Sequence, residues 1–350
     1  MSDVAAVSDV AAMGERDRSL DVAKGLAITA IVVSHVLRGL AGPDTIPRQS
    51  TAFLELDDAL YAWHVAVFAL LAGVFLPAGV EKRGRLAYLR PRVILFAYLY
   101  VLWTILQAGE KQIEASLRGD PVDTGGFLQS FVTAYGQLWW LAFMVLASVA
   151  AVGVRPWASR RRAAISTAAV GVMALAAWGW TGPWVFEEGL ALLLFFWIGL
   201  LAGRERLTRL TTSRRTPWIA AVGLVVGLAL LVVADPMPPS SWIGPRSAGG
   251  IALGVLTSTS LCVGVVAIAG VLSRTPLVRP MGLLGERSLE LFLGHILAIA
   301  ATHAAFDRQG ISNLGVQIVG AAVAGLALPL GVWWLGRRLH FPWLFTSPWR

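Results

Sequence analysis

Ten long apolar runs are the feature that most constrains how this chain can fold. They are separated by short polar connections and fall at residues 25–41, 59–79, 93–108, 136–154, 164–182, 186–203, 217–234, 249–272, 288–306 and 315–335. A helix crosses the hydrocarbon core of a bilayer with roughly 20 apolar residues. Only 14% of the residues are charged, against about 25% in soluble domains. The sequence therefore predicts an all-α, polytopic integral membrane protein with about ten transmembrane helices.

The basic residues predict the orientation of these helices. With a cytoplasmic N-terminus, 23 of the 29 lysines and arginines fall on the cytoplasmic side, and the six others are Arg38, Arg48, Lys111, Arg118, Arg246 and Arg308. The positive-inside rule then predicts both termini in the cytoplasm of a multi-pass protein of the cell (plasma) membrane. Because the cations are dispersed between apolar runs, the net charge of +8 needs no nucleic acid partner.

No internal repeat or interdomain linker divides the chain, so residues 18–340 are expected to form one transmembrane domain in the lipid bilayer. Residues 1–17 lack the basic start and cleavage site of a signal peptide and are expected to be a disordered cytoplasmic tail. Residues 341–350 are expected to be a second cytoplasmic tail. The single cysteine, Cys262, allows no intramolecular disulfide, and no metal site is expected. Nothing in the sequence sets an oligomeric state.

A polar stripe runs along the first apolar segment. On a helix turning about 100° per residue, Lys24 and His35 lie roughly 20° apart, and Asp21 and Arg38 lie within about 60° of them. His35 is about 16 Å along the axis from Lys24, inside the hydrocarbon, where an ionisable group is costly and marks function. A histidine can act there as a general base. The alternatives are a histidine bonded to its own helix backbone and a simple Asp21–Lys24 ion pair.

Two further runs carry ionisable residues into the membrane. His64, in the second run, is predicted at a depth comparable with His35, so the two imidazoles can share one site, or His64 can be structural at a helix end. Gly73 permits close approach of another helix or of an acyl chain. Glu290 and His295 lie in the ninth run.

A basic segment joins the second and third runs. Its five cations are Lys82, Arg83, Arg85, Arg90 and Arg92. Arginine binds phosphate through two parallel hydrogen bonds, so the segment suits a polyphosphorylated ligand such as coenzyme A. Positive-inside topology is the alternative explanation for some of these charges.

Five motifs resemble those of one known family. LDVAKGLAITAIVVSHV is similar to the opening signature of the acyltransferase 3 family of membrane-bound O-acyltransferases, a Leu-Asp pair, a basic residue before Gly and a histidine eleven positions later. It looks most like the fucose 4-O-acetylase-like branch. The later motifs follow in order over roughly residues 18–300, as WHVAVFALLAGVF, YLRPRVILFAYLYVLW, LWWLAFMVL and SLELFLGH. Lys24 stands where most members have arginine, Ala66 replaces a proline and Ala72 a serine.

The resemblance implies transfer of an acyl group, most simply acetyl, from cytoplasmic acetyl-CoA to a hydroxyl of an envelope sugar, glycan or glycolipid. Acyl-CoA would be a donor substrate, with no permanently bound cofactor. His35 would be the base, His64 would orient a substrate, and Lys24 with the five cations of 81–92 would hold coenzyme A. Structural or substrate-positioning roles are expected for Asp21, Arg38, Gly73, Glu290 and His295.

Intramembrane histidines also suit a proton-coupled transporter or flippase of an envelope precursor. Such folds show inverted repeats and paired broken helices, which this sequence lacks. A third alternative is an inactive family member that acts as an envelope scaffold.

Overall fold

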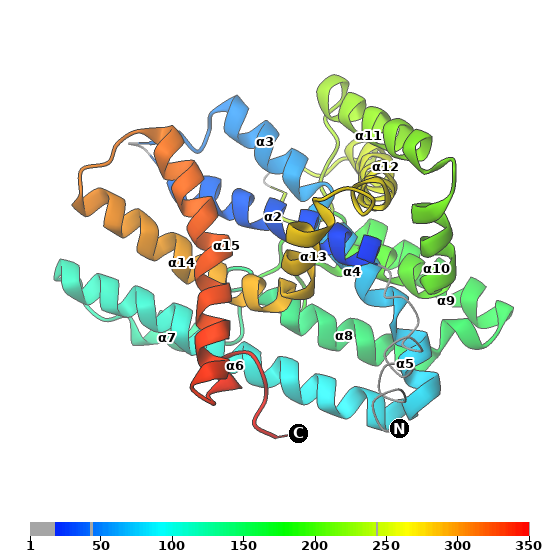
Figure 1. The fold of residues 1–350 in the computed structure, drawn as a ribbon, viewed down its shortest axis with the longest axis horizontal. Coiled ribbons are helices and arrows are strands. Elements are labelled where there is room, and N and C mark those ends of the chain that lie inside the picture. Colours follow the sequence, from blue (N-terminus) through cyan, green and yellow to red (C-terminus); the bar gives the residue numbers. More distant parts are fainter. Residues whose placement is uncertain (1–17, 43–44, 243, 350) are drawn as a thin grey trace, which may run out of the picture.

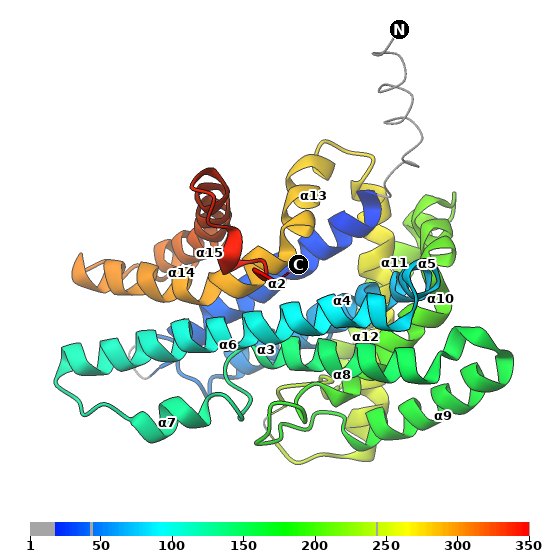
Figure 2. The same cartoon turned by 90° about the horizontal axis from the view of Figure 1, so that it is seen from below.

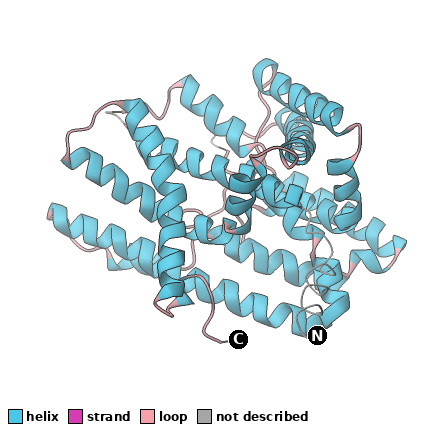
Figure 3. Ribbon diagram, in the orientation of Figure 1, coloured by secondary structure: helices cyan, strands magenta, loops and turns pink. Residues whose placement is uncertain are grey.

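The computed structural model describes residues 18–42, 45–242 and 244–349, and all of its regular elements are helices (Figure 3). This confirms the predicted all-α class, with 77% of the chain helical. The α-helices are α2 (Arg18–Leu40), α3 (Thr51–Tyr61), α4 (His64–Val74), α5 (Leu76–Arg83), α6 (Arg85–Arg118), α7 (Thr124–Gln129), α8 (Trp139–Val154), α9 (Arg160–Ala176), α10 (Leu193–Thr212), α11 (Thr216–Val233), α12 (Ala248–Leu272), α13 (Val278–Glu286), α14 (Ser288–Arg308) and α15 (Leu314–Arg338). The expected tail at 1–17 lies outside the described residues.

Every apolar run predicted from the sequence contains a helix, and eight described segments are long and apolar enough to cross a membrane. These eight do not include α9, which has 17 residues, or α10, whose last two turns carry several charges. The protein is therefore a polytopic membrane protein. The number of crossings and the cytoplasmic position of the termini stay predictions.

Helix α2 lies in the middle of the bundle, with α11 and α12 on one side and α14 and α15 on the other (Figure 1). It packs against α4, α12, α13, α14 and α15, so most of its apolar side chains are buried, whereas α11 and α15 are largely exposed. Helices α6 and α8 extend along one flank of the bundle (Figure 2). Helix α2 is therefore surrounded by other helices of the protein.

The second predicted run is broken in two places. Helix α3 ends at Tyr61, and the non-helical backbone of Trp63 (φ −137°, ψ −35°) separates it from α4. A second break at Phe75 separates α4 from α5. No proline or glycine marks the first break, so the apolar run alone did not predict it. The break makes His64 the first residue of α4.

Helix α13 packs closely on the beginning of α2 through two glycines. A Cβ atom added to Gly25 would lie 2.1 Å from the carbonyl oxygen of Met281, and one added to Gly285 would lie 1.8 Å from that of Asp21. Real contacts of this kind are never so short, so this crossing excludes larger residues. It holds the first two turns of α2 in place beside α14.

We expect Gly285→Ala to lower the free energy of unfolding by about 1–3 kcal/mol, because the added methyl group overpacks the crossing with α2. Gly282→Ala is the matched control in α13, since a Cβ there meets no atom within 4 Å. The better helix propensity of alanine should make that control neutral or slightly stabilising. Thermal unfolding of both variants in one detergent measures the difference. Equal melting temperatures would contradict the close packing.

Candidate functional site

A cavity of about 550 Å³ runs alongside α2 and is lined by residues from α2, α3, α4, α6, α8, α13 and α14. Five residues singled out from the sequence line it together, namely Lys24, His35, Arg38, His64 and Arg92. Lys24 and Arg38 are fourteen residues apart on α2, a rise of about 21 Å. One continuous space thus joins the basic end of α2 to its far end.

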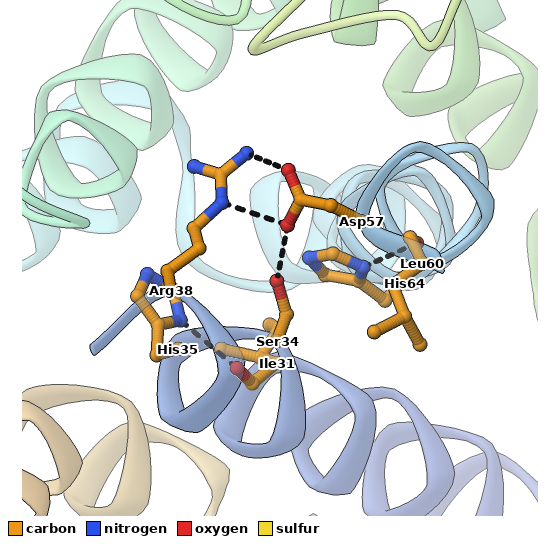
Figure 4. A network of polar contacts seen from close by, with 7 residues as sticks. All are labelled: Ile31, Ser34, His35, Arg38, Asp57, Leu60 and His64. Carbon is orange, nitrogen blue, oxygen red and sulfur yellow. Dashed lines mark hydrogen bonds and ion pairs between the residues drawn. The ribbon is translucent and has the colours of Figure 1, made fainter. Parts of the chain in front are cut away.

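Hydrogen bonds fix the tautomers of the two cavity histidines. Nδ1 of His35 lies 2.9 Å from the carbonyl oxygen of Ile31, and Nδ1 of His64 bonds the carbonyl oxygen of Leu60 (Figure 4). A carbonyl oxygen only accepts, so in each neutral ring Nδ1 carries the proton and Nε2 the lone pair. Nε2 of His64 is buried with no partner. Both rings can therefore accept a proton or a hydrogen bond within the cavity.

His295 lies behind His35 and does not line the cavity. The two rings meet edge to face with centroids 4.9 Å apart, and Nδ1 of His295 lies 2.9 Å from the carbonyl oxygen of Leu291. His295 is fully buried. It supports the ring of His35 from α14 and limits the orientations that ring can adopt.

Arg38 and Asp57 form a partly buried ion pair at the far end of the cavity. Nε and Nη2 of Arg38 donate to the two carboxylate oxygens at 2.8 and 2.6 Å, and the Ser34 hydroxyl donates to Oδ1 at 3.3 Å (Figure 4). The guanidinium group also lies 3.9 Å from the ring centroid of Tyr61. This two-bond geometry fixes the Arg38 fork and ties α2 to α3. Asp57 was not predicted as a site residue, because it lies in the connection between the first two apolar runs; the acidic pair Asp57–Asp58 directly before the second run was the available signal.

A second cavity, of about 400 Å³, adjoins the Arg38 end. Its polar lining is mostly acidic and comprises Thr51, Glu55, Asp57, Asp58, Asp235 and Ser241, with Trp242 beside them. Ser241 lines both cavities, and Asp57 lines the second while it binds Arg38. The Arg38–Asp57 pair therefore stands between the two spaces.

The opposite end of the central cavity holds two cations, Lys24 and Arg92, and one carboxylate, Glu286. Lys24 lines it and is 3.2 Å from Asp21, and Arg92 lines it with its guanidinium carbon 4.5 Å from the ring centroid of Tyr88. Four cations of the basic segment are exposed and lie outside the cavity, namely Lys82, Arg83, Arg85 and Arg90. The structure thus brings two of the predicted phosphate-binding cations to the site and leaves the others at the surface of α5 and α6.

Gly73 and Glu290 also lie outside the cavity lining. A Cβ on Gly73 would lie 2.1 Å from the carbonyl oxygen of Phe196, so this glycine allows α10 to approach α4. Glu290 is 3.4 Å from Arg287, whose guanidinium stacks 3.9 Å from the centroid of Trp333. Gly73 thus serves the packing of α4 on α10, and Glu290 forms an ion pair within α14 and its N-terminal flank. Within the described ranges, no group of three or more His, Cys, Asp or Glu side chains is placed to hold a metal ion.

Glu188 is a buried carboxyl group in the loop before α10. Burial raises its pKa from 4.5 to about 7, against the lowering effects of the Ser241 backbone N–H and the charge of Arg38. One carboxyl oxygen has no hydrogen-bond partner. Its protonated form is therefore favoured in the folded protein below neutral pH.

We expect this loop to lose stability as the pH rises. The folded protein holds the Glu188 proton up to a pKa of about 7, and the unfolded chain releases it near 4.5, so stability falls between these values. Glu188→Gln removes this titration and should raise the free energy of unfolding by up to about 3 kcal/mol at pH 8, with little change at pH 4.5. Melting temperatures at both pH values test this. A gain that does not depend on pH would contradict it.

A family model matches the sequence over the residues that build this site. The family model of acyltransferase 3, described as an acyltransferase domain, matches residues 17–336. That match covers most of the chain and all of the cavity lining. No curated protein and no solved structure matches the chain.

Proposed function

The chain belongs to the acyltransferase 3 family and is a membrane acyltransferase, and we propose that it transfers an acyl group, most simply acetyl, from acyl-CoA to a hydroxyl of an envelope sugar, glycan or glycolipid. The observation that carries this proposal is the single cavity in which a cationic end, two histidines with accepting nitrogens and an arginine follow one another. A transfer between two substrates needs such a shared space. The narrower likeness to the fucose 4-O-acetylase-like branch stays a prediction.

The donor would enter at the end lined by Lys24 and Arg92. Phosphate groups bind ammonium and guanidinium cations strongly, and the exposed cations of α5 and α6 extend this basic surface outside the cavity. The positive-inside rule predicts that this end lies at the cytoplasmic face, the side proposed for acyl-CoA entry. The thioester would then extend along α2 toward His35.

His35 would act as the general base. Its Nε2 takes the proton from the acceptor hydroxyl as the oxygen attacks the thioester carbonyl, giving a tetrahedral oxyanion. The oxyanion collapses, the C–S bond breaks, and the coenzyme A sulfur receives the proton from His35. The products are the ester and free coenzyme A. His64, with its unpartnered Nε2, would accept a hydrogen bond that orients the acceptor.

The acceptor would approach through the second cavity. Its carboxylates can accept hydrogen bonds from sugar hydroxyls, and Trp242 offers a ring face for stacking. Arg38, beside this cavity, uses Nε and Nη2 for Asp57 and leaves Nη1 outside that pair. That group would donate to the developing oxyanion.

We expect Lys24→Gln and Arg92→Gln to raise the KM for acetyl-CoA by about 10- to 100-fold, because each change removes a charged hydrogen-bond donor to phosphate. Arg279→Gln is the matched control, since Arg279 is exposed on α13 and outside the cavity. Its KM should stay within about twofold of the wild-type value. Steady-state release of free thiol measures all three variants. Equal KM values in all of them would contradict the placement of the donor.

A second assay must distinguish acyl transfer from transport of an envelope precursor. Purified protein in vesicles that contain envelope lipids and glycans should release coenzyme A from acetyl-CoA and leave the label on one of those molecules. Movement of an envelope precursor with no coenzyme A release would fit a transporter and contradict the proposed function.

A further inference from the structure

Two buried glutamines bond neighbouring carbonyl groups of α14. Nε2 of Gln137 donates to the carbonyl oxygen of Phe292 at 3.3 Å, and Nε2 of Gln107 donates to that of Leu293 at the same distance. Gln107 is 3% exposed and Gln137 is 4% exposed. Each of the two side chains therefore makes one hydrogen bond to the backbone of α14.

The two glutamines differ in their position relative to the central cavity. Gln137 lines the central cavity, whereas Gln107 is outside its lining. The Oε1 atom of Gln137 is buried and has no hydrogen-bond partner. Because its NH₂ group is held by Phe292, the amide cannot turn this oxygen away without losing that bond. A buried amide oxygen without a partner costs about 1–3 kcal/mol, so a bonding partner at this point is strongly favoured.

The backbone before α8 places Gln137 in this position. Gly136 has a left-handed conformation with φ of +52°, and the backbone N–H groups of Leu138 and Trp140 then bond the carbonyls of Tyr135 and Gln137 in two tight turns. The second turn runs into the first two residues of α8, Trp139 and Trp140, which line the cavity wall. Backbone hydrogen bonds on both sides therefore fix the position of Gln137.

A series of contacts through α14 links Gln137 to the proposed base. Gln137 bonds Phe292, whose ring lines the cavity and lies 6.2 Å, centroid to centroid, from the ring of His295. His295 in turn packs against His35 at 4.9 Å. Gln137 and His35 therefore line the same cavity, and the α14 segment that Gln137 bonds also carries the histidine that packs against His35.

We propose that Oε1 of Gln137 accepts a hydrogen bond from a substrate N–H or O–H group adjacent to the reacting carbonyl, and so positions that substrate for attack. This inference rests on the proposed function. Two substrates offer such a donor. The pantetheine arm of coenzyme A carries an amide N–H two carbons from its sulfur, and the acceptor carries hydroxyl groups beside the one that reacts.

The test compares Gln137→Met with Gln107→Met. Methionine has nearly the shape of glutamine, and each substitution removes one bond to α14, so both variants should lose similar thermal stability. Only Gln137→Met also removes an acceptor from the cavity. Gln137→Glu is the second variant, because it restores an accepting oxygen while it gives up the bond to Phe292.

The first readout is the affinity of the purified protein for free coenzyme A and for adenosine 3′,5′-bisphosphate, which lacks the pantetheine arm. If the amide N–H is the partner, Gln137→Met weakens coenzyme A binding about tenfold. Gln107→Met and Gln137→Glu then stay within about threefold of wild type, and binding of the bisphosphate is unchanged throughout.

The second readout is the fate of labelled acetyl groups in vesicles that contain envelope lipids and glycans. If the acceptor hydroxyl is the partner, coenzyme A affinity is unchanged, and the ratio of transferred to hydrolysed acetyl falls about tenfold in Gln137→Met only. Equal changes in both methionine variants, or none in either, would overturn the role of Gln137. A wild-type protein that neither binds coenzyme A nor transfers acetyl would refute the proposed function itself.

Discussion

His35→Ala and His35→Gln should each lower the rate of acyl transfer by about 100- to 10,000-fold, the usual contribution of a general base. Glutamine can still donate a hydrogen bond toward the carbonyl of Ile31, which His35 contacts at 2.9 Å, but it cannot take up the hydroxyl proton. Equal losses of rate in the two variants would therefore show that the missing base, and not the missing side-chain packing, slows the reaction. Single-turnover transfer from acetyl-CoA measures the chemical step.

The control for this experiment is His340→Ala. His340 is exposed after the last residue of α15 and far along the chain from the cavity lining, so its variant should keep the wild-type rate. Coenzyme A binding should also persist in the His35 variants, because the cations that would hold the phosphates lie at the other end of the cavity. A His35→Gln enzyme that works within about tenfold of wild type would exclude His35 as the base.

Breaking the Arg38–Asp57 pair should give the second large effect. Asp57→Ala leaves the Arg38 guanidinium without its carboxylate, which costs about 3–5 kcal/mol for a fully buried pair. Arg38 is 31% exposed at its side chain, so about 2 kcal/mol is the expected loss of stability here. We also expect a fall in kcat of roughly 100-fold, because the fork that would stabilise the oxyanion is no longer fixed.

A double-mutant cycle measures this coupling. Arg38→Met and Asp57→Leu are each expected to destabilise the protein, and the double variant should be more stable than the sum of the two losses, since no unpaired charge remains. Arg38→Lys should be nearly as inactive as Arg38→Met, because an ammonium group cannot make the bidentate contact. Additive losses of stability, or full activity in Arg38→Lys, would contradict the role assigned to the pair.

Periodicity and composition were enough to predict the helical class and the helices, because each run long enough to span a bilayer must satisfy its own backbone hydrogen bonds. They were not enough to predict the breaks around His64 and Phe75 or the short helix α13. Those features depend on contacts with distant segments, such as the close approach of α13 to Asp21 in α2. The sequence of an apolar run does not indicate which distant segment it will contact.

The same distinction applies to the site. The costly position of His35 in a hydrocarbon-spanning segment identified it from the sequence, and the shared depth of His64 predicted a common site for the two histidines, which do line one cavity. Asp57 and Gln137 were missed, since an acidic residue in a connection and a glutamine before a tryptophan pair are common in any membrane protein. The contacts that single them out are with Arg38 and Phe292, 19 and 155 residues away in the chain.

The most direct test of the account is the side from which acetyl-CoA is used. Membrane vesicles with the cytoplasmic face outward should transfer label from external acetyl-CoA to envelope glycans or glycolipids, and the His35→Ala protein should not. Sealed vesicles of the opposite orientation should transfer none. Equal transfer from both faces, or transfer that survives the loss of His35, would contradict a reaction in which the donor enters at Lys24 and meets the acceptor at His35.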